Sequence, residues 1–457
     1  MAERTFSIED TLSALLAGKK YSTIKDILVT MNPSDVASVF EDMEEDRLPL
    51  LFRLLPKEEA AETFVEMDPE LQEMLIKGFS DSELREVVDE LYVDDAVDIV
   101  EEMPANVVRR ILSQADPEMR KQINEILRYP ENSAGSIMTT EYVSLRPSMT
   151  VGEAITRIRR TGVDKETIYT CYVTKDRNLL GMVTVKDLLL AQDDDTPVSE
   201  IMDTNVISVN THADQEEVAQ MLSKYNFIAL PVVDSDNRMV GIITFDDAMD
   251  VLEEETTEDI EIMAGITPSD KTYLRSTPFD LFRHRIPWLL LLMVSATFTG
   301  MIITHFESAL AHLVVLTAFI PMLMDTGGNS GSQSSVTVIR AISLNELEFS
   351  DLAVVIWKEI RTAVLCGLAL AAACFAKVML VDRLLLGNTD VSILVAAVVC
   401  ATMAFTILVA KIVGCTLPML AKRLGFDPAV MASPFITTIV DALSLLIYFG
   451  IASAVLF

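Results

Sequence analysis

Side chains that bind soft metals or form disulfides are scarce in this sequence of 457 residues, which contains 5 cysteines and 4 histidines. No spacing between them is typical of a zinc site or a disulfide framework. We therefore expect no zinc or copper centre and a reducing cytosolic environment for the soluble part. The first residues are charged and amphipathic, so we expect no signal peptide.

Basic residues are few as well, with 36 Lys and Arg against 68 Asp and Glu and a formal net charge of -32. The imbalance lies before Ile286, where 28 basic residues face 58 acidic ones. From Ile286 onward the chain is apolar, with 8 basic and 10 acidic residues. The acidic part repels nucleic acid and attracts cations, so we expect no nucleic-acid partner. We find no nucleophile–base pair and no phosphate-binding loop that would indicate an enzyme.

Residues 1–130 contain a loose repeat of short amphipathic segments. Each segment has an apolar stripe followed by an acidic pair and often a proline, as in VASVFEDM (36–43) and AVDIVEEMP (96–104). Such a pattern predicts short helices that each end at the proline or the acidic pair. We interpret residues 1–130 as an all-α superhelical domain.

Residues 131–252 contain a second repeat, with a period of about sixty residues. The motif Gly–apolar–apolar–Thr–x–x–Asp occurs as Gly181–Asp187 and again as Gly241–Asp247. Apolar β-rich runs at 168–174 and 227–234 predict a β-α-β-β-α order in each half. The pattern resembles a tandem pair of CBS modules, an α/β fold that often binds adenine nucleotides.

Residues 253–285 are expected to connect the soluble part to the apolar part. The segment EEETTEDIEIMAGI (253–266) predicts a helix that continues out of the second module. Its crowded carboxylates run toward the membrane, so this helix is suited to couple the two parts.

The apolar part, residues 286–457, predicts an all-α domain that crosses a membrane. About twenty apolar residues cross the hydrocarbon core, and we assign five spans on this basis: 286–304, 310–335, 360–382, 391–418 and 429–456. Basic residues before the first span and at Arg340, Lys358 and Arg361 place those loops in the cytosol. The N-terminus is then cytoplasmic and the C-terminus extracytoplasmic.

The stretch Pro321–Gln333 starts in an apolar run and turns into glycine, serine, Asn329 and Gln333. Irregular backbone at membrane depth is tolerated only where it lines a cavity or pore. We therefore expect a broken second span, with Gly328 and Asn329 offering oxygen ligands to a passing cation.

Asp441 lies near the middle of the last predicted span. A carboxylate there costs roughly 2.5–3.5 kcal/mol even on insertion scales. One interpretation is a protonated acid or a pair with Lys411, and the other is an ion-path ligand. We favour the ion path, because intramembrane acids are usually functional and Mg²⁺ prefers oxygen ligands.

The remaining acids form one-sided clusters with few lysines between them. Solvated helix faces would explain many charge runs. Like charges at short range oppose a compact state, however, and a divalent cation between two faces would reverse that penalty. The clusters are Asp94, Asp95 and Asp98; Asp246, Asp247 and Asp250; and the run Glu253–Asp259, with Glu255 and Glu258.

Taken together, the order of these parts resembles the MgtE-type bacterial magnesium channels over essentially the whole chain. The resemblance rests on GGNSGSQ, on DPAVMASPFITTIVD (427–441) and on DDAMDVLEEETTEDI (246–260). It implies a homodimeric, multi-pass channel among the lipids of the bacterial plasma membrane, which cytosolic Mg²⁺ closes.

The resemblance also implies roles for individual residues. Asp441 would hold hydrated Mg²⁺ in the pore, and Asp427 would share an ion with the connecting helix. The sensor sites would use Asp94, Asp95, Asp98, Glu216, Asp247, Asp250, Glu255, Glu258 and Asp259. Asn226 departs from the family, which often has an acid there. ATP would bind the CBS pair at Tyr169, Thr184 and Asp187.

Two alternative functions stay open at this point. The first is a secondary carrier that exchanges Mg²⁺ for H⁺ or Na⁺, with Lys377, Lys411 and Asp441 as a proton relay. The second is a nucleotide sensor on a membrane anchor, although an anchor needs neither the polar stretch nor Asp441.

Overall fold

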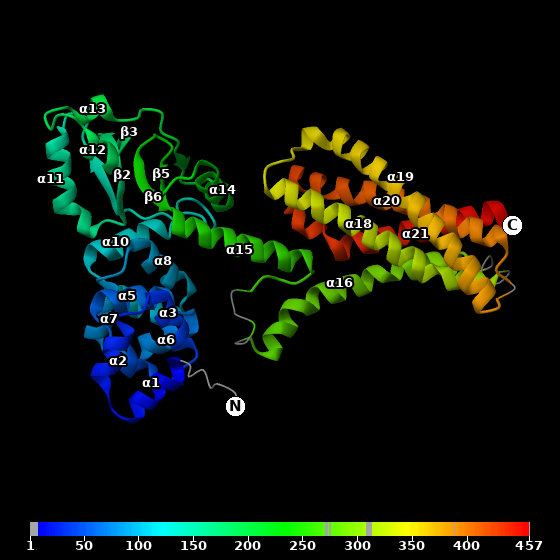
Figure 1. Cartoon of the computed structure of the whole chain (residues 1–457), viewed down its shortest axis with the longest axis horizontal. Coiled ribbons are helices and arrows are strands. Elements are labelled where there is room, and N and C mark those ends of the chain that lie inside the picture. Colours follow the sequence, from blue (N-terminus) through cyan, green and yellow to red (C-terminus); the bar gives the residue numbers. More distant parts are fainter. Residues whose placement is uncertain (1–7, 270–272, 274–275, 308–312, 389, 457) are drawn as a thin grey trace, which may run out of the picture. The chain divides into compact units, whose positions relative to one another are not determined.

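The computed structural model describes residues 8–269, 273, 276–307, 313–388 and 390–456 (Figure 1). The chain divides into two compact units, Met1–Leu252 and Glu253–Phe457. The predicted starts of the helical domain at residue 1 and of the second span at residue 310 lie outside the described residues.

From residue 8 onward, where the structure describes it, the first unit begins with ten helices, and they are short, as the sequence predicts. They often begin at a cap that satisfies free backbone N–H groups: the Asn32 side chain accepts from Ser34, and Ser80 and Glu83 form a capping box. The helices are α1 (Ile8–Ala17), α2 (Tyr21–Leu28), α3 (Pro33–Glu41), α4 (Leu48–Phe52), α5 (Lys57–Val65), α6 (Pro69–Gly78), α7 (Asp81–Val88), α8 (Val93–Glu102), α9 (Ala105–Gln114) and α10 (Pro117–Ile126).

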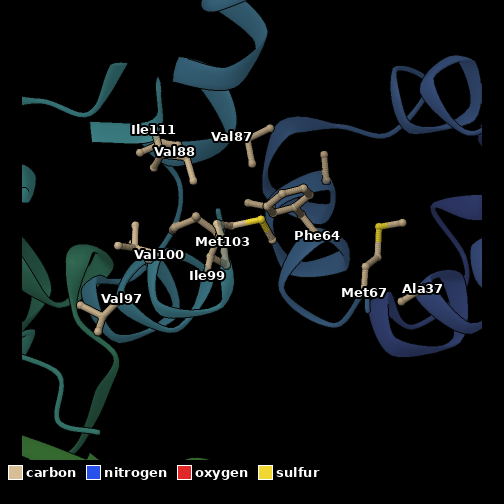
Figure 2. Close-up of a cluster of buried hydrophobic side chains, with 14 of the residues drawn as sticks. Ala37, Phe64, Met67, Val87, Val88, Val97, Ile99, Val100, Met103 and Ile111 are labelled. Atoms are coloured by element: carbon tan, nitrogen blue, oxygen red, sulfur yellow. The ribbon is translucent and has the colours of Figure 1, made fainter. Parts of the chain in front are cut away.

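These helices stack in order along a superhelix, since α3 packs on α5, α5 on α7 and α7 on α9. The apolar stripe of each helix faces one shared core, part of which Figure 2 shows around Phe64 and Met103. Phe64 is 2% exposed, and full burial of such a side chain contributes roughly 1.5–3 kcal/mol. The all-α superhelical fold is confirmed.

Two modules with the predicted β-α-β-β-α order follow in the chain. Their sheets run β1-β2-β3 and β4-β5-β6, each with one parallel and one antiparallel pair. The elements are β1 (Tyr142–Leu145), α11 (Val151–Thr161), η1 (Gly162–Asp164), β2 (Thr167–Lys175), β3 (Asn178–Thr184), α12 (Val185–Leu190), α13 (Val198–Ile201), β4 (Val209–Asn210), α14 (Gln215–Tyr225), β5 (Ala229–Val233), β6 (Met239–Thr244) and α15 (Phe245–Met263).

The helical stack and the second module share one hydrophobic core, whereas the first module has a core of its own. Buried residues on β5, β6 and the start of α15 belong to the same cluster as those of α8 and α9. This packing brings the acidic first turn of α8 close to the acidic first turn of α15. Helix α15 also continues past Leu252, as the sequence predicts for residues 253–266.

The described part of the second unit contains five long helices. These are α16 (Pro278–His305), α18 (Ile320–Ser343), α19 (Leu352–Lys377), α20 (Ile393–Arg423) and α21 (Ser433–Leu456). Short helical segments flank them: η2 (Val314–Phe319), η3 (Phe349–Asp351), the π-helical η4 (Val378–Leu385) and η5 (Pro428–Met431). The unit therefore has the expected all-α, five-helix fold.

Four helical stretches among the described residues are long and apolar enough to cross a membrane: Pro278–His305, Phe349–Leu385, Ile393–Arg423 and Pro428–Leu456. Helix α18 has 24 residues, but its serines and glycines keep it outside this group. It packs against both α20 and α21. A fifth span therefore stays a prediction.

The expected break in Pro321–Gln333 is wrong, because α18 runs through the whole stretch as a continuous helix. Its glycines serve close helix packing instead, as small residues do in membrane bundles. A Cβ on Gly327 would lie 2.6 Å from Thr406 Cγ2 on α20, and one on Gly331 would lie 2.8 Å from Ile436 Cγ2 on α21. The carbonyl groups of this stretch are therefore engaged in the helix rather than displayed.

Candidate functional site

A hollow of about 470 Å³ with both apolar and polar lining residues opens between α18 and α21 in the second unit. Asp441, Asn329 and Gly328 line it, so the structure brings together the three residues that the sequence predicts for the ion path. Gly328 makes the approach possible, because a Cβ there would meet Thr437 Cγ2 at 3.0 Å.

Asp325 lines the same hollow and was missed in the sequence. It lies one helical turn before Asn329, whose Nδ2 donates a hydrogen bond of 3.1 Å to Asp325 Oδ1. The hollow therefore carries two carboxylates, Asp325 and Asp441, and one amide. The sequence did mark this residue, because Asp325 is a second acid within an apolar stretch. An acid in such a stretch is a functional candidate by default.

The two lysines of the proposed proton relay have other partners. Lys411 Nζ lies 3.6 Å from Glu359 Oε2, and Lys377 Nζ lies 2.8 Å from Asp382 Oδ2. Lys411 thus pairs with Glu359 rather than with Asp441. Nothing in these contacts joins the lysines to the hollow.

A second group of acids lies in the first unit, where α8 meets the start of α15. Asp94, Asp95 and Asp98 come from α8, and Asp246 and Asp247 come from the first turn of α15. Asp94 is only 6% exposed. Asp247 also caps α15, since it accepts hydrogen bonds from the backbone and hydroxyl of Thr244.

Burial and mutual repulsion perturb these groups strongly. Burial, followed by the nearby Asp247 carboxylate, raises the pKa of Asp95 to about 7 and that of Asp98 to about 8. The same causes raise the pKa of Asp94 well above its ordinary value. Burial first, then partial compensation by Thr244, leaves the pKa of Asp247 raised to about 6. Ionising all of these acids at once is therefore unfavourable.

Two further acids of the first module, Glu141 and Glu166, belong to this group and were missed in the sequence. Glu141 Oε2 accepts a hydrogen bond of 3.1 Å from the backbone N–H of Val93 at the start of α8. Burial, then Asp247 and Asp95, raises the pKa of Glu166 to about 8. Each is an isolated acid beside a strand in the sequence, so no cluster marked them.

The group offers oxygens that a hard cation would use. Asp94 Oδ1 and Glu166 Oε2 are buried and have no hydrogen-bond partner. Buried polar atoms are usually paired, and Mg²⁺ or Ca²⁺ takes carboxylate oxygens. Among the described residues no three His, Cys, Asp or Glu side chains are already arranged to hold a metal ion. A cation would therefore have to draw these side chains together.

Two other predicted sensor residues are Glu216 and Asp250, and the Asp250 carboxylate adds to the charges that raise the pKa of Asp247. Glu216 on α14 accepts a hydrogen bond of 2.9 Å from Gln220 on the same helix, and Asp250 lies on α15 one turn after Asp246. Asn226 ends α14 in the left-handed conformation with φ 55°. Asparagine tolerates that conformation better than most residues, which gives a structural reason for an asparagine at position 226.

Within the second unit, Asp259 on α15 and Asp427 before η5 lie close enough to interact. Burial, then the Asp427 carboxylate, raises the pKa of Asp259, and Glu255 adds to the effect. The Ser343 hydroxyl donates a hydrogen bond of 3.2 Å to Asp259 Oδ2. Asp427 caps η5 through the N–H of Ala429 at 2.7 Å. Glu258 lies one residue before Asp259 on an exposed part of α15.

The three residues expected to bind ATP lie together at the first module. Thr184 and Asp187 form a capping box at the start of α12. Tyr169 on β2 is 65% exposed and adjoins Thr170, the strand partner of Thr184. The capping box is a structural role that these two residues fill without a ligand.

Comparisons with known proteins agree along the chain. The family model for divalent cation transporters, MgtE, matches residues 320–451; the MgtE intracellular N domain matches 31–132; and CBS domains match 134–194 and 198–254. The magnesium transporter MgtE of Thermus thermophilus is 36% identical over 438 residues, 95% of each chain. That of Bacillus subtilis is 32% identical over 445 residues, covering 96% of this chain and 95% of the relative.

A solved structure supports the fold of the first unit. The crystal structure of the cytosolic domain of the Mg²⁺ channel MgtE in complex with ATP is 36% identical, with a TM-score of 0.51. It covers 53% of this chain and all of that chain. From its length-wide similarity to these relatives, its matched domains and its fold, this chain belongs to the MgtE family of magnesium transporters.

Proposed function

We propose that the chain forms a Mg²⁺-selective channel in the bacterial plasma membrane and that cytosolic Mg²⁺ closes it. The observation that carries the proposal is the open hollow between α18 and α21, where Asp325, Asn329 and Asp441 present oxygen atoms from two otherwise apolar helices. Mg²⁺ sheds its water reluctantly. A hollow of about 470 Å³ leaves room for an ion that keeps part of its hydration shell.

Helix α18 is the fifth span in this proposal, despite its polar residues. Its packing against α20 and α21 buries its glycines and Ser330, Ser334 and Ser335. Asp325, Asn329 and Gln333 stay exposed, and polar residues of a membrane span usually face a water-filled path or the interior of the bundle. An odd number of spans puts the two termini on opposite sides of the membrane, and the basic residues before the first span would put the N-terminus in the cytoplasm. A homodimer would place the hollows of two copies around one path.

Gating rests on the acids of the first unit. At low Mg²⁺ the carboxyl groups of these acids (Asp94, Asp95, Asp98, Glu166 and Asp247) repel one another, and a bound ion bridges them when the Mg²⁺ concentration rises. Moving a two-state balance from 1:99 to 99:1 takes about 5.5 kcal/mol of differential binding. One weak, water-rich site supplies less than that, so several sites act together.

A second set of sensor groups lies at the connecting segment. Asp259 and Asp427 repel each other across α15 and η5, with Glu255 nearby. A cation shared by these groups would fix α15 beside η5, the segment that leads into α21. Glu216, Asp250 and Glu258 would supply further ligands along the same surfaces.

ATP is proposed as a ligand of the CBS pair at Tyr169, Thr184 and Asp187. The support is the similarity of the first unit to a cytosolic domain crystallised with ATP. The nucleotide would stack on the exposed Tyr169 ring and meet the Thr184 hydroxyl at the start of α12. Its binding would change the stability of the first unit and so modulate the gate.

Single-channel recording from an excised membrane patch tests the proposal. We expect discrete current steps carried by Mg²⁺, whose open probability falls as Mg²⁺ on the cytosolic side rises. The D441N variant, made and inserted at the same level, should carry no Mg²⁺ current. Uptake without resolvable steps, and with a fixed ratio of H⁺ or Na⁺ countertransport, would establish the carrier instead.

A further inference from the structure

A buried ion pair with a serine between its partners ties three helices of the second unit together. Lys411 of α20 and Glu359 of α19 have side chains that are 6% and 15% exposed, with 3.6 Å between Nζ and Oε2. The Ser334 hydroxyl of α18 donates to Glu359 Oε2 at 2.6 Å, and Lys411 Nζ donates to Ser334 Oγ at 3.1 Å. Each helix contributes one group, and the two charges cancel.

Such a pair is costly to keep inside a membrane unit. Lysine and glutamate are rare in membrane helices, and when present they pair with one another or mark a functional element. Removing two charged groups from water costs more free energy than burying two apolar side chains of the same size. Lys411 and Glu359 do not line the hollow, so the ion path does not account for them.

The position of Ser334 on α18 suggests what the pair does. Ser334 follows Asn329 by five residues and Asp325 by nine, which is about 7.5 and 13.5 Å along a helix. A shift of α18 along or around its axis at Ser334 therefore displaces the hollow-lining residues by a similar amount. A close contact between α18 and α20 lies one turn away, where a Cβ on Gly414 would overlap the carbonyl oxygen of Gly331.

We propose that Glu359, Ser334 and Lys411 are positioning residues that set the register of α18 against α19 and α20. Through α18 they hold Asp325 and Asn329 at the correct height opposite Asp441. A hydroxyl is suited to this place because it both donates and accepts, so Ser334 bonds the anion and the cation at once. The inference rests on the proposed ion path only for its effect on transport, and the placement of α18 is tested separately.

The separate test measures the distance between α18 and α21 by cross-linking. A Cβ built on Gly328 lies 3.4 Å from Thr437 Cβ, close to the roughly 3.5–4.5 Å of a disulfide. A full-length chain with G328C and T437C should therefore cross-link rapidly in membrane vesicles under mild oxidant. The chain with G328C alone controls for pairing with a native cysteine.

The ion pair is then altered in this background. We expect K411M and S334A to slow cross-linking roughly fivefold or more, because the register of α18 is released. The exchanged pair E359K/K411E should restore the rate to within about twofold, since both charges and the serine bonds can re-form. T337A is the matched control, because the Thr337 hydroxyl bonds only within α18, to Gln333 at 2.7 Å.

Each result decides the proposal. Cross-linking rates that stay unchanged in S334A, or an exchanged pair that cross-links as slowly as K411M, would overturn it. If K411M is not inserted, S334A and the exchanged pair still decide. Mg²⁺ uptake should follow the same order of variants. If the exchanged pair restores cross-linking but even the unaltered chain takes up no Mg²⁺, the ion path is contradicted. The positioning role of the three residues is still supported in that case.

Discussion

Asp247, at the start of α15, is the side chain that most strongly raises the pKa of Asp94 on α8, after burial itself. These two residues belong to parts of the chain about 150 positions apart, and one hydrophobic core holds them together. Packing thus keeps near each other carboxylates that repel one another. A cation that binds between the two carboxylates would relieve their repulsion, and this relief would add to its binding free energy.

Replacing one of these acids by its amide should relieve the repulsion between the carboxylates. D94N should stabilise the metal-free first unit by on the order of 1–2 kcal/mol, because the amide carries no acid that must take up a proton or stay charged when it is buried beside Asp247. It should also weaken the response to Mg²⁺, since a ligand is lost. Limited proteolysis of the full-length protein, with and without millimolar Mg²⁺, measures both effects. D10N, on the remote first helix, is the control, and a D94N digest identical to the unaltered protein would refute the prediction.

Stability of the metal-free first unit should fall with rising pH. The pKa values of Asp98 and Glu166 are raised from 3.8 and 4.5 to about 8. Protons bound more tightly in the folded state stabilise it fully below the unfolded pKa, and this contribution is lost as pH rises through the folded value. Mg²⁺ competes with these protons, so its protection should be larger at about pH 8 than at about pH 6. Thermal unfolding at both pH values measures this, and equal protection would argue against it.

The two acids of the hollow should differ in their effect on uptake. D441N should abolish rescue of a host that lacks Mg²⁺ transport, because it removes the acid at the centre of the last span. D325N should lower uptake by roughly tenfold at limiting Mg²⁺, the effect of losing about 1.4 kcal/mol of ion stabilisation. E346Q, outside the hollow, should transport normally. Normal rescue by D441N would remove this residue from the ion path.

Close packing along α18 should tolerate no added methyl group. G414A would drive a Cβ into the carbonyl oxygen of Gly331, an overlap with backbone that no rotamer relieves, and should cost roughly 1–3 kcal/mol. G300A on α16 is the matched control, because nothing lies within 4 Å of its Cβ. The measurements are protein level in the membrane and thermal stability in detergent. Equal behaviour of the two variants would contradict the helix contact.

Much of the fold could be predicted because its signals are local. The proline and acidic stops mark the short helices, and the repeated Gly–x–x–Thr–x–x–Asp motif marks both modules. The course of Pro321–Gln333 could not be read the same way. Glycine and serine favour a break in water, but between α20 and α21 they allow close contact, and the hydrogen bonds of a continuous helix are retained.

The site was predictable where acids cluster in the sequence and not where tertiary contact gathers them. Asp441 and Asn329 are conspicuous in their segments, and Asp325 was overlooked beside the glycine motif. Glu141 and Glu166 stand alone in the sequence and join Asp94 only after the first module packs against α8. Lys411 gave a plausible partner for Asp441 until its contact with Glu359 was known.

The most direct test of the account measures open probability against cytosolic Mg²⁺ in excised patches. The unaltered channel and the D94N/E166Q variant are compared at equal conductance. We expect open probability to fall steeply with Mg²⁺ in the unaltered channel, and the variant to need roughly tenfold more Mg²⁺ for the same closure, or about 1.4 kcal/mol of lost binding. Superimposable curves would show that the buried carboxylates of the first unit do not sense the ion.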